Sequence, residues 1–339
     1  MKKSVNPENI LIIKPGAIGD LLQLTPTIRA IKTTYLKAKI SILVGSAATA
    51  DLFKYSPHIH ETLIFDKRGV HNSIAALVRL WRYLRLRRYD VVINFQRSNL
   101  KTWFLSTAAF PCRVLIYHKT RHKNIHAVSD HLKTVHPLGV ETSDIALEFY
   151  VGEDDIRFAR HIFDTIGTDG KFVIALNPGA SHAVNRWPAA RFTALADMLA
   201  KQLAAKIIII GGREDVPLAY EIAEATIANP LVIAGKTNLL QLGAVLSRCD
   251  ILVTGDTGPM HVATAVGAKV VALFGAADPA RTGPVGVGHR VVYAQDVACV
   301  PCRKRKCTNK FYLECMEKIS VEDVYDEILY ILKEKHKIL

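Results

Sequence analysis

The chain has 339 residues, of which 50% are hydrophobic and 8% aromatic. This apolar content is ample for packed cores and excludes a disordered or collagen-like chain. Lys and Arg outnumber Asp and Glu by 44 to 31, giving a net charge of +13. Residues 1–150 carry +12 of this charge and residues 151–339 carry +1, so a polyanionic partner is expected mainly at the first part of the chain.

The length fits two domains of about 150 residues each. No apolar run approaches the ~20 residues of a membrane-spanning helix. The run Ile10–Ile13, behind Lys2 and Lys3, is too short for a signal peptide and is not followed by a cleavage site. We therefore expect a cytoplasmic protein.

Short β-branched runs alternate with longer amphipathic stretches, which predicts βα units and parallel sheets. The stretch 139–155 breaks this pattern and is interpreted as the connection between two domains. The predicted fold class is α/β, with two doubly wound, Rossmann-like domains that face a central cleft. Strands are expected at residues 9–14, 39–44, 62–65, 90–95, 113–116, 172–177, 206–211, 231–233, 251–254 and 270–274, and a terminal helix at 321–335.

The loop after the first predicted strand is Lys14-Pro15-Gly16-Ala17-Ile18-Gly19-Asp20. Its glycines permit a tight turn, but it matches neither a Walker A loop nor the full G-x-G-x-x-G of a dinucleotide site. The second strand ends without the acidic residue that would hold a ribose, which disfavours a nicotinamide cofactor. Asp20 lies at the start of a predicted helix, where a carboxylate is favoured either as a helix cap or as a functional group.

Two loops of the second part have the character of anion-binding loops. Gly255-Asp256-Thr257-Gly258-Pro259 joins a strand to a helix, so that backbone amides and the Thr257 hydroxyl can bind phosphate. His261 falls one turn into that helix and fits a structural or a ligand-binding role. The loop 177–188 is long for a βα connection, and its Arg186 carries a permanent charge and a fork suited to a diphosphate.

These motifs resemble those of the ADP-heptose:lipopolysaccharide heptosyltransferases of glycosyltransferase family 9, and they occur in order over nearly the whole chain. The resemblance implies a GT-B fold. Residues 1–150 would bind the acceptor, 151–320 the nucleotide sugar, and the terminal helix 321–339 would pack back towards the N-terminal domain. The implied reaction is inverting transfer of heptose from ADP-heptose to the lipopolysaccharide inner core, a lipid A/Kdo-type acceptor, with no cofactor required. The motifs are Ile13–Asp20 with Thr25-Pro26 and Arg29-Ala30, the Asn177-Pro178-Gly179 loop ending Arg186-Trp187-Pro188, and Gly255–Ala263.

The resemblance also implies roles for single residues. Asp20 would be the general base that takes the proton of the acceptor hydroxyl. Asn185 stands where the family often has Lys, so phosphate neutralisation is assigned to Arg186. Glu214, or its neighbour Asp215, would bind the ribose. The expected donor-binding residues are Gly19, Gly179, Ser181, Arg186, Glu214, Asp256, Thr257, Gly258 and His261.

The excess positive charge of the first part is concentrated in two stretches. Residues 74–88 predict a basic amphipathic helix that could lie on an anionic membrane or could pack in the core with a solvated basic face. Its expected apolar face is formed by Ile74, Leu77, Val78, Trp81 and Leu84. Residues 113–136 add further Lys, Arg and His, including His131, which suit an anionic glycolipid, whereas no nucleic-acid-binding module is recognised. The expected acceptor-binding residues are Arg97, Lys119, Arg121, His122 and Lys123.

Four of the six cysteines fall within one short stretch, Cys299, Cys302, Cys307 and Cys315. Four thiolates suffice for a tetrahedral structural zinc site, while the spacing matches no common iron–sulfur pattern. Disulfide pairing and reduced thiols remain open alternatives. The other two, Cys112 and Cys249, have the character of buried or half-buried thiols.

Two further functions fit the same sequence. A transferase on this scaffold could use another nucleotide sugar or another acceptor. A protein without catalytic activity could use the basic part to hold an anionic glycan or a membrane surface. We expect neither of these but the function implied by the resemblance, that of a cytoplasmic heptosyltransferase bound peripherally to the inner membrane.

Overall fold

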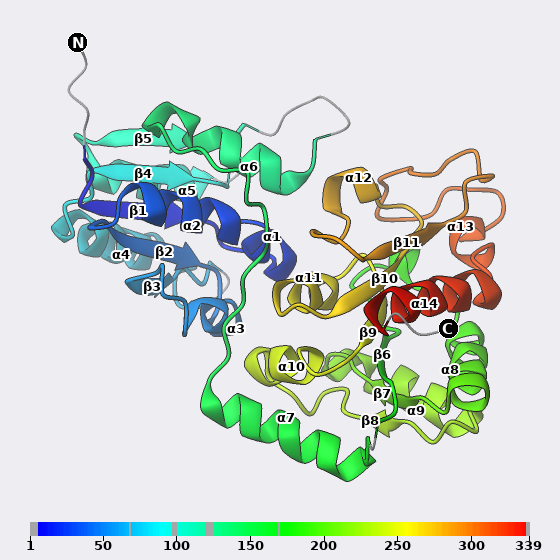
Figure 1. Ribbon diagram of the computed structural model, residues 1–339. Coiled ribbons are helices and arrows are strands. Elements are labelled where there is room, and N and C mark those ends of the chain that lie inside the picture. The colour runs from blue at the N-terminus through cyan, green and yellow to red at the C-terminus, as the bar shows by residue number, and fades with distance from the viewer. Residues whose placement is uncertain (1–5, 68, 97–99, 119–124, 169, 337–339) are drawn as a thin grey trace. The chain divides into compact units, whose positions relative to one another are not determined.

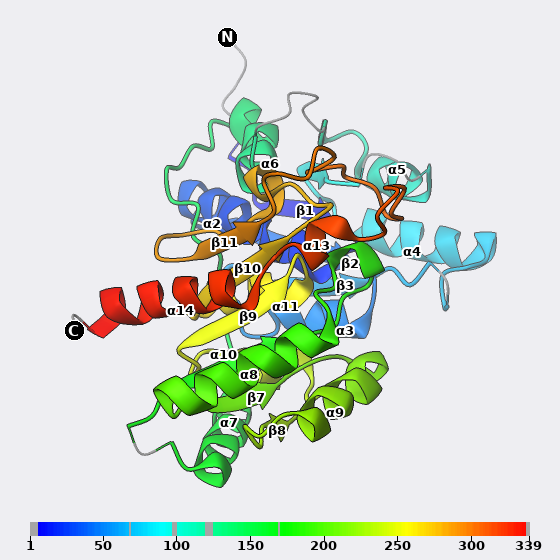
Figure 2. The ribbon, with the colours of Figure 1, turned by 90° about the vertical axis from the view of Figure 1, so that its right-hand side faces the viewer.

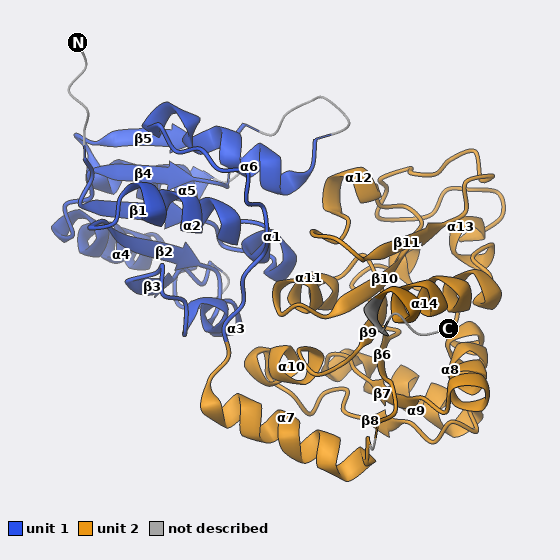
Figure 3. Ribbon diagram, viewed as in Figure 1, with its two compact units in different colours: residues 1–150 blue, residues 151–339 orange. Residues whose placement is uncertain are grey.

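The computed structural model describes residues 6–67, 69–96, 100–118, 125–168 and 170–336 (Figure 1). The chain divides into two compact units, Met1–Tyr150 and Val151–Leu339 (Figure 3). Each unit is a parallel sheet covered by helices, so the predicted α/β class with two doubly wound units is confirmed.

The sheet of the first unit has the order β3-β2-β1-β4-β5. The order reverses between β1 and β4, whose last residues Ile13 and Asn94 pair in parallel register. Ligands of doubly wound sheets bind beyond the carboxyl ends of the strands at such a reversal, so the loop after β1 is well placed for function. The strands are β1 (Asn9–Ile13), β2 (Lys39–Val44), β3 (Glu61–Ile64), β4 (Val91–Asn94) and β5 (Arg113–Ile116).

Helices cover both faces of this sheet. The face formed by Leu11, Ile13 and Leu43 packs on Leu80 and Leu84 of α4 and on Leu105 of α5. Figure 1 shows α2 and α6 on the other side of the sheet from α4. The helices are α1 (Ile18–Leu22), α2 (Thr25–Thr34), α3 (Ala47–Ala50), α4 (Ile74–Leu86), α5 (Leu100–Ser106) and α6 (Ala127–Val135), with 3-10 turns η1 (Asp51–Phe53), η2 (Thr107–Ala109) and η3 (His136–Leu138).

The sheet of the second unit has the order β11-β10-β9-β6-β7-β8, and its reversal lies between β6 and β9. The edge strand β11 was not expected from the sequence, because its four residues, Arg-Val-Val-Tyr, are only partly buried and give no apolar run. The strands are β6 (Val173–Asn177), β7 (Lys206–Ile209), β8 (Leu231–Val232), β9 (Ile251–Gly255), β10 (Lys269–Phe274) and β11 (Arg290–Tyr293).

The helices of the second unit also lie on both faces. One face of the sheet forms a continuous core with α8, α9 and α14, and α10 packs against α7 on the other side. They are α7 (Glu153–Ile166), α8 (Ala189–Leu203), α9 (Val216–Ala225), α10 (Leu239–Leu246), α11 (Gly258–Ala265), α12 (Pro279–Thr282), α13 (Glu314–Glu317) and α14 (Val321–His336), with 3-10 turns η4 (Ala183–Asn185) and η5 (Arg213–Asp215).

The terminal helix α14 has its described apolar contacts within the second unit. Val324, Ile328 and Leu332 are buried in the core that also contains Trp187. Figures 1 and 2 both show α14 beside α8 and over β10. That the helix also packs back towards the first domain, as the resemblance implies, stays a prediction.

The connection between the units is shorter than the sequence predicted. Residues 153–155 were assigned to it, but they form the first turn of α7. The Asp155 carboxylate accepts a hydrogen bond from the Gly152 amide at 3.1 Å, and acidic residues are favoured at a helix N-terminus. These three carboxylates therefore begin a helix.

Within the described residues, no helix has both the length and the apolar character needed to cross a bilayer.

Candidate active site

The loop between β1 and α1 requires two glycines. Gly16 has a φ of +145°, a conformation that side chains rarely adopt. A Cβ on Gly45, at the end of β2, would lie 2.2 Å from the carbonyl oxygen of Pro15. Glycine at both positions therefore allows the turn to pack closely on the end of β2. This packing determines the position of Asp20 at the start of α1.

Of the two roles that the sequence left open for Asp20, the structure confirms the helix cap. Its Oδ2 accepts a hydrogen bond from the Ala17 amide at 3.3 Å and so caps the helix. The same oxygen lies 3.3 Å from Nζ of Lys14. The Lys14 side chain is 8% exposed, while that of Asp20 is 50% exposed. A carboxylate held by a buried ammonium ion and an amide, with its outer side open, is suited to receive a proton from a bound alcohol.

His131, in α6, lies near this ion pair and is not part of a basic surface, so that expectation was wrong. It is 3% exposed, and its ring lies edge-on to Phe95 and Tyr117 at centroid distances of 5.3 and 5.2 Å. Burial, together with the charge of Lys14, lowers the pKa of His131 to about 4, and the Gln23 carbonyl partly offsets the two. A neutral imidazole therefore packs beneath the loop that carries Asp20.

This histidine makes stability depend on pH. The pKa of His131 is about 4 in the folded chain and ordinarily about 6.5, so the unfolded chain takes up the proton first as the pH falls. The contribution of neutral His131 to the free energy of unfolding is fully present above pH ~6.5. It falls by ~3 kcal/mol as the pH is lowered towards ~4. We expect His131→Gln to reduce the loss of unfolding free energy between about pH 7.5 and about pH 5 in urea titrations.

Some acid sensitivity should remain in that variant, because burial also lowers the pKa of His289 in the second unit to about 4. His289→Gln serves as the matched control and should remove a separate part of the pH dependence of the unfolding free energy. An unchanged pH dependence in His131→Gln would contradict the assignment.

In the second unit, Asn177 joins three loops at the reversal of the sheet. It ends β6 and pairs in register with Thr254 of the adjacent β9. Its Nδ2 donates to the Gly179 carbonyl at 3.3 Å, to Thr254 Oγ1 at 2.9 Å and to Thr257 Oγ1 at 3.2 Å. The Thr254 and Thr257 hydroxyls also bond to each other at 2.9 Å. No individual role was predicted for Asn177 or Thr254, because their adjacency depends on strand order.

Thr257 is the N-cap of α11, followed by Gly258 and Pro259 at the start of the helix. A helix N-terminus presents backbone amides and the positive end of the helix dipole, which together favour a phosphate group. His261 lies one turn further and is 4% exposed. The predicted phosphate-binding arrangement of strand, glycine, hydroxyl and helix is therefore present at one end of the sheet.

Asn185 connects the loops 177–188 and 255–259, and it stands at the position where the sequence departs from the family pattern. Its Nδ2 donates to the Asp256 carbonyl at 3.2 Å. A Cβ on Gly255 would lie 2.3 Å from the Asn185 carbonyl oxygen, so the backbones touch here. Nε of Arg186 donates to the Ala180 carbonyl at 2.9 Å, and Thr282 donates to the Asp256 carboxylate at 3.4 Å.

The structure distinguishes between the two candidate ribose-binding carboxylates. Asp215 packs directly on the loop, since a Cβ on Gly179 would lie 2.1 Å from its carboxyl carbon. The Asp215 carboxylate also accepts a hydrogen bond from the Gly212 amide at 2.9 Å. Glu214 is exposed, as is Ser181. Asp215, rather than Glu214, thus packs on the loop 177–188.

The expected acceptor-binding side chains cannot be placed in this way, because all of them lie outside the described residues. They are Arg97, Lys119, Arg121, His122 and Lys123.

The four clustered cysteines line one cavity of about 500 Å³. All carry free thiols, and Cys315 is buried while Cys299 is exposed. Burial raises the pKa of the Cys315 thiol, and the other three cysteines raise it further. In the described part of the chain, no three His, Cys, Asp or Glu side chains are assembled closely enough to hold a metal ion. Cys112 is half-buried and Cys249 buried, as predicted.

The chain is similar to known proteins over most of its length. A lipooligosaccharide heptosyltransferase 2 of Campylobacter jejuni subsp. jejuni serotype O:6 is 27% identical over 327 residues, covering 94% of this chain and 98% of that protein. The crystal structure of a family 9 glycosyl transferase from Veillonella parvula DSM 2008 matches with a TM-score of 0.86 at 27% identity, covering 96% of this chain and 98% of that chain.

The structure of the E. coli ADP-heptose lps heptosyltransferase II matches with a TM-score of 0.79 at 21% identity, covering 96% of this chain and 99% of that chain. The fold is GT-B. The model of glycosyltransferase family 9 (heptosyltransferase) matches residues 77–313. The chain therefore belongs to glycosyltransferase family 9 and is a glycosyltransferase of the lipopolysaccharide heptosyltransferase family.

Proposed function

We propose that this enzyme transfers heptose from ADP-heptose to the lipopolysaccharide inner core, with inversion at the anomeric carbon. The observation that carries the donor half is the set of hydroxyls around Asn177 at the N-terminus of α11. The E. coli neighbour named for ADP-heptose has the same fold. The first unit, with its charge of +12, supplies the acceptor side.

The chemical step needs one base and one stabilised leaving group. The acceptor oxygen forms a bond to the anomeric carbon while its proton passes to the Asp20 carboxylate, and the bond to the phosphate oxygen breaks with its electron pair leaving on ADP. An aspartate carboxylate is a weak base, so the proton moves late, when the acceptor oxygen has become acidic. A single displacement inverts the anomeric configuration.

The leaving diphosphate is stabilised by groups of the second unit. The Thr257 hydroxyl and the Gly258 amide donate to it, and the guanidinium of Arg186 meets its charge. Asp256 contacts the sugar, and Asp215 replaces Glu214 as the ribose partner. His261 supports the helix turn that carries these donors. In this proposal Arg186 and the α11 amides neutralise the diphosphate, and no cofactor is assigned to the step.

The acceptor is an anionic glycolipid, which places the enzyme at the cytoplasmic face of the inner membrane as a peripheral protein. Phosphates and acidic sugars of lipid A and Kdo match the positive charge of the first unit. The same charge could attract nucleic acid, but no nucleic-acid-binding module is present in the sequence.

We also propose that the four-cysteine loop binds one structural zinc ion. Four thiolates are a complete tetrahedral ligand set, and all four line a single cavity. Because no three possible ligands are assembled closely enough in the described part of the chain, the loop would have to close around the ion. We expect about one zinc per chain by elemental analysis, lost in Cys302→Ser but retained in the control Cys112→Ser. A metal-free wild-type protein that is equally stable with and without chelator would contradict this site.

A panel of nucleotide sugars with truncated lipopolysaccharide acceptors tests the proposed function. Only ADP-heptose should give a product, and only with acceptors that retain the Kdo residues. Turnover of a hexose donor in preference to ADP-heptose would replace the proposed donor, and turnover on an uncharged acceptor alone would replace the proposed acceptor.

A further inference from the structure

Helix α4 keeps only part of its expected apolar face against the core. Ile74, Leu77, Val78, Trp81 and Leu84 were expected to form that face, lying either on a membrane or in the core. The buried residues are Ala76, Leu80 and Leu84, and Leu77 and Trp81 are partly buried against the same core. Ile74 is 82% exposed, and Leu86 at the other end is 81% exposed. Large apolar side chains at both ends of the helix therefore lie at the surface.

The neighbouring helix α5 also directs apolar side chains outward. Leu100, Trp103 and Phe104 follow a spacing of three and four residues, which places them on one side of a helix. Leu100 is 87% exposed, and both aromatic residues are partly exposed. The opposite side, with Thr102, Leu105 and Ser106, is buried.

The two helices form one continuous surface. The Trp81 ring stacks on Phe104 at a centroid distance of 6.0 Å, and its Nε1 donates to Thr107 Oγ1 at 3.0 Å. The Arg85 guanidinium lies 5.5 Å from the Trp81 ring centroid and donates to the Phe110 carbonyl at 3.0 Å. These contacts define the α4–α5 surface, whose exposed members are Ile74, Arg79, Arg82, Arg85, Leu86, Leu100, Trp103, Phe104 and Phe110.

Positive charge on this surface is not balanced by acidic residues. From Lys67 to Arg113 the sequence has ten Lys or Arg and a single acidic residue, Asp90. The Asp90 carboxylate accepts hydrogen bonds from the Glu8 and Asn9 amides, and Glu61 of β3 pairs with Arg87 on the flank of α4. Among the described residues, no hydrogen bond or ion pair joins the side chains of Arg79 and Arg82 to an acidic group.

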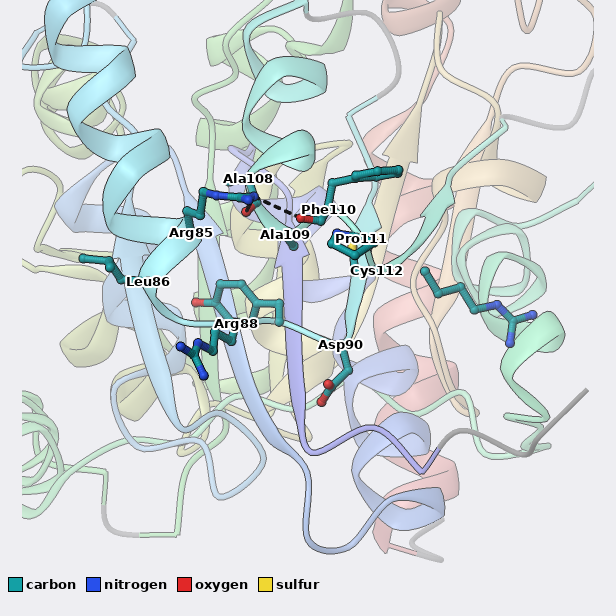
Figure 4. A pocket seen from close by; sticks show the side chains of 11 residues that line it. Arg85, Leu86, Arg88, Asp90, Ala108, Ala109, Phe110, Pro111 and Cys112 are labelled. Atoms are coloured by element: carbon teal, nitrogen blue, oxygen red, sulfur yellow. Dashed lines mark hydrogen bonds between the residues drawn. The ribbon is translucent and has the colours of Figure 1, made fainter.

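A cavity adjoins the C-terminal end of the surface. It measures about 830 Å³ and is lined by residues 85, 86, 88–90 and 108–113. Figure 4 shows Arg85, Leu86 and Arg88 on one side of it and Phe110 to Cys112 on the other. Arginine side chains beside exposed Leu86 and Phe110 combine a phosphate-binding charge with groups that enter an acyl layer.

We propose that the α4–α5 surface binds an anionic phospholipid bilayer, with the adjoining cavity receiving a phosphate-bearing headgroup. Arginines attract the negative surface potential of such a bilayer. Trp and Phe at the same level enter the headgroup region, and exposed leucines anchor below it. An RNA would match the charge, but it would leave Ile74, Leu86 and Leu100 without an apolar environment. This inference specifies a partner within the proposed function.

The test uses the full chain and vesicles without acceptor, so that it does not depend on catalysis. Vesicles of phosphatidylcholine mixed with phosphatidylglycerol should sediment with the protein at low salt, and binding should weaken as salt increases. The variant Arg82→Gln with Leu86→Ser should bind about 30-fold more weakly. The matched control, Leu36→Ser with Lys37→Gln, changes an exposed leucine and lysine beyond α2 and should bind as the wild type does.

Activity with a delipidated, soluble acceptor should be the same in both variants and in the wild type, which separates failure of membrane binding from failure of catalysis. Equal binding to pure phosphatidylcholine, equal loss in both variants, or binding of RNA in preference to vesicles would each overturn the proposal. Salt-sensitive, variant-sensitive binding with no heptose transfer would support the surface and reject the proposed function.

Discussion

Replacement of Asp20 by Asn should lower kcat for heptose transfer by about 10²- to 10⁴-fold, the range typical of a lost general base. Asn can still accept the hydrogen bond from the Ala17 amide, but it cannot take the proton of the acceptor hydroxyl. The affinity for ADP should be unchanged, because the donor loops lie in the second unit. Initial rates and calorimetric ADP binding measure the two quantities separately.

The matched control is Asp51→Asn, which removes a carboxylate from η1 of the same unit. It should keep wild-type kcat. Because Asp20→Asn also removes the partner of buried Lys14, its thermal unfolding is measured in parallel to show that the protein remains folded. Turnover within a few-fold of the wild type, in a folded Asp20→Asn protein, would reject Asp20 as the base.

Replacement of Arg186 by Gln should weaken donor binding by about 10- to 100-fold, as expected when a hydrogen bond to a charged group is lost. Nε of Arg186 is held by the Ala180 carbonyl, which orients the terminal nitrogens of the guanidinium as a fork. The loss should appear in the KM for the nucleotide sugar and in the Kd of ADP. The KM for the acceptor should not change.

Arg160→Gln, on the exposed side of α7, provides the control for loss of a positive charge from the second unit. It should bind ADP normally. If Arg186→Gln bound ADP with wild-type affinity, the diphosphate would have to be neutralised elsewhere, and the assignment of this position in place of the family lysine would be wrong.

Much of the fold could be predicted because its signals are local. The buried strands β1, β2 and β6 are continuous apolar runs, and each was located within one or two residues. The short edge strand β11 has no such run. Its existence depends on pairing with β10. The carboxylates at 153–155 were interpreted as a linker because a helix N-terminus and a polar connection have the same composition.

The candidate site was predictable only where a motif is contiguous. Asp20, Thr257 and Gly258 were found from their loops. Asn177 and Thr254 were missed as a pair, since 77 residues separate them and only the parallel register brings them together. Likewise, Asp215 and not Glu214 contacts Gly179 because the turn η5 determines which side chain faces the loop.

The orientation of α4 shows a further limit of prediction from sequence. Its residues alternate apolar and basic so frequently that two different faces satisfy an amphipathic pattern. Packing on β-strand residues such as Leu63 and Val92 selects Leu80 and Leu84 for the core. Ile74, a member of the expected apolar face, is left outside, as is Leu86, which the pattern did not include.

The central claim is that this chain moves heptose from ADP-heptose to an inner-core acceptor. The most direct test incubates the purified enzyme with ADP-heptose and a Kdo-containing lipid A acceptor, followed by mass spectrometry of the acceptor. The acceptor should gain one heptose residue with the wild type and show no measurable gain with Asp20→Asn in the same time. An unchanged acceptor mass with the folded wild-type enzyme, or the gain of a different sugar, would contradict it.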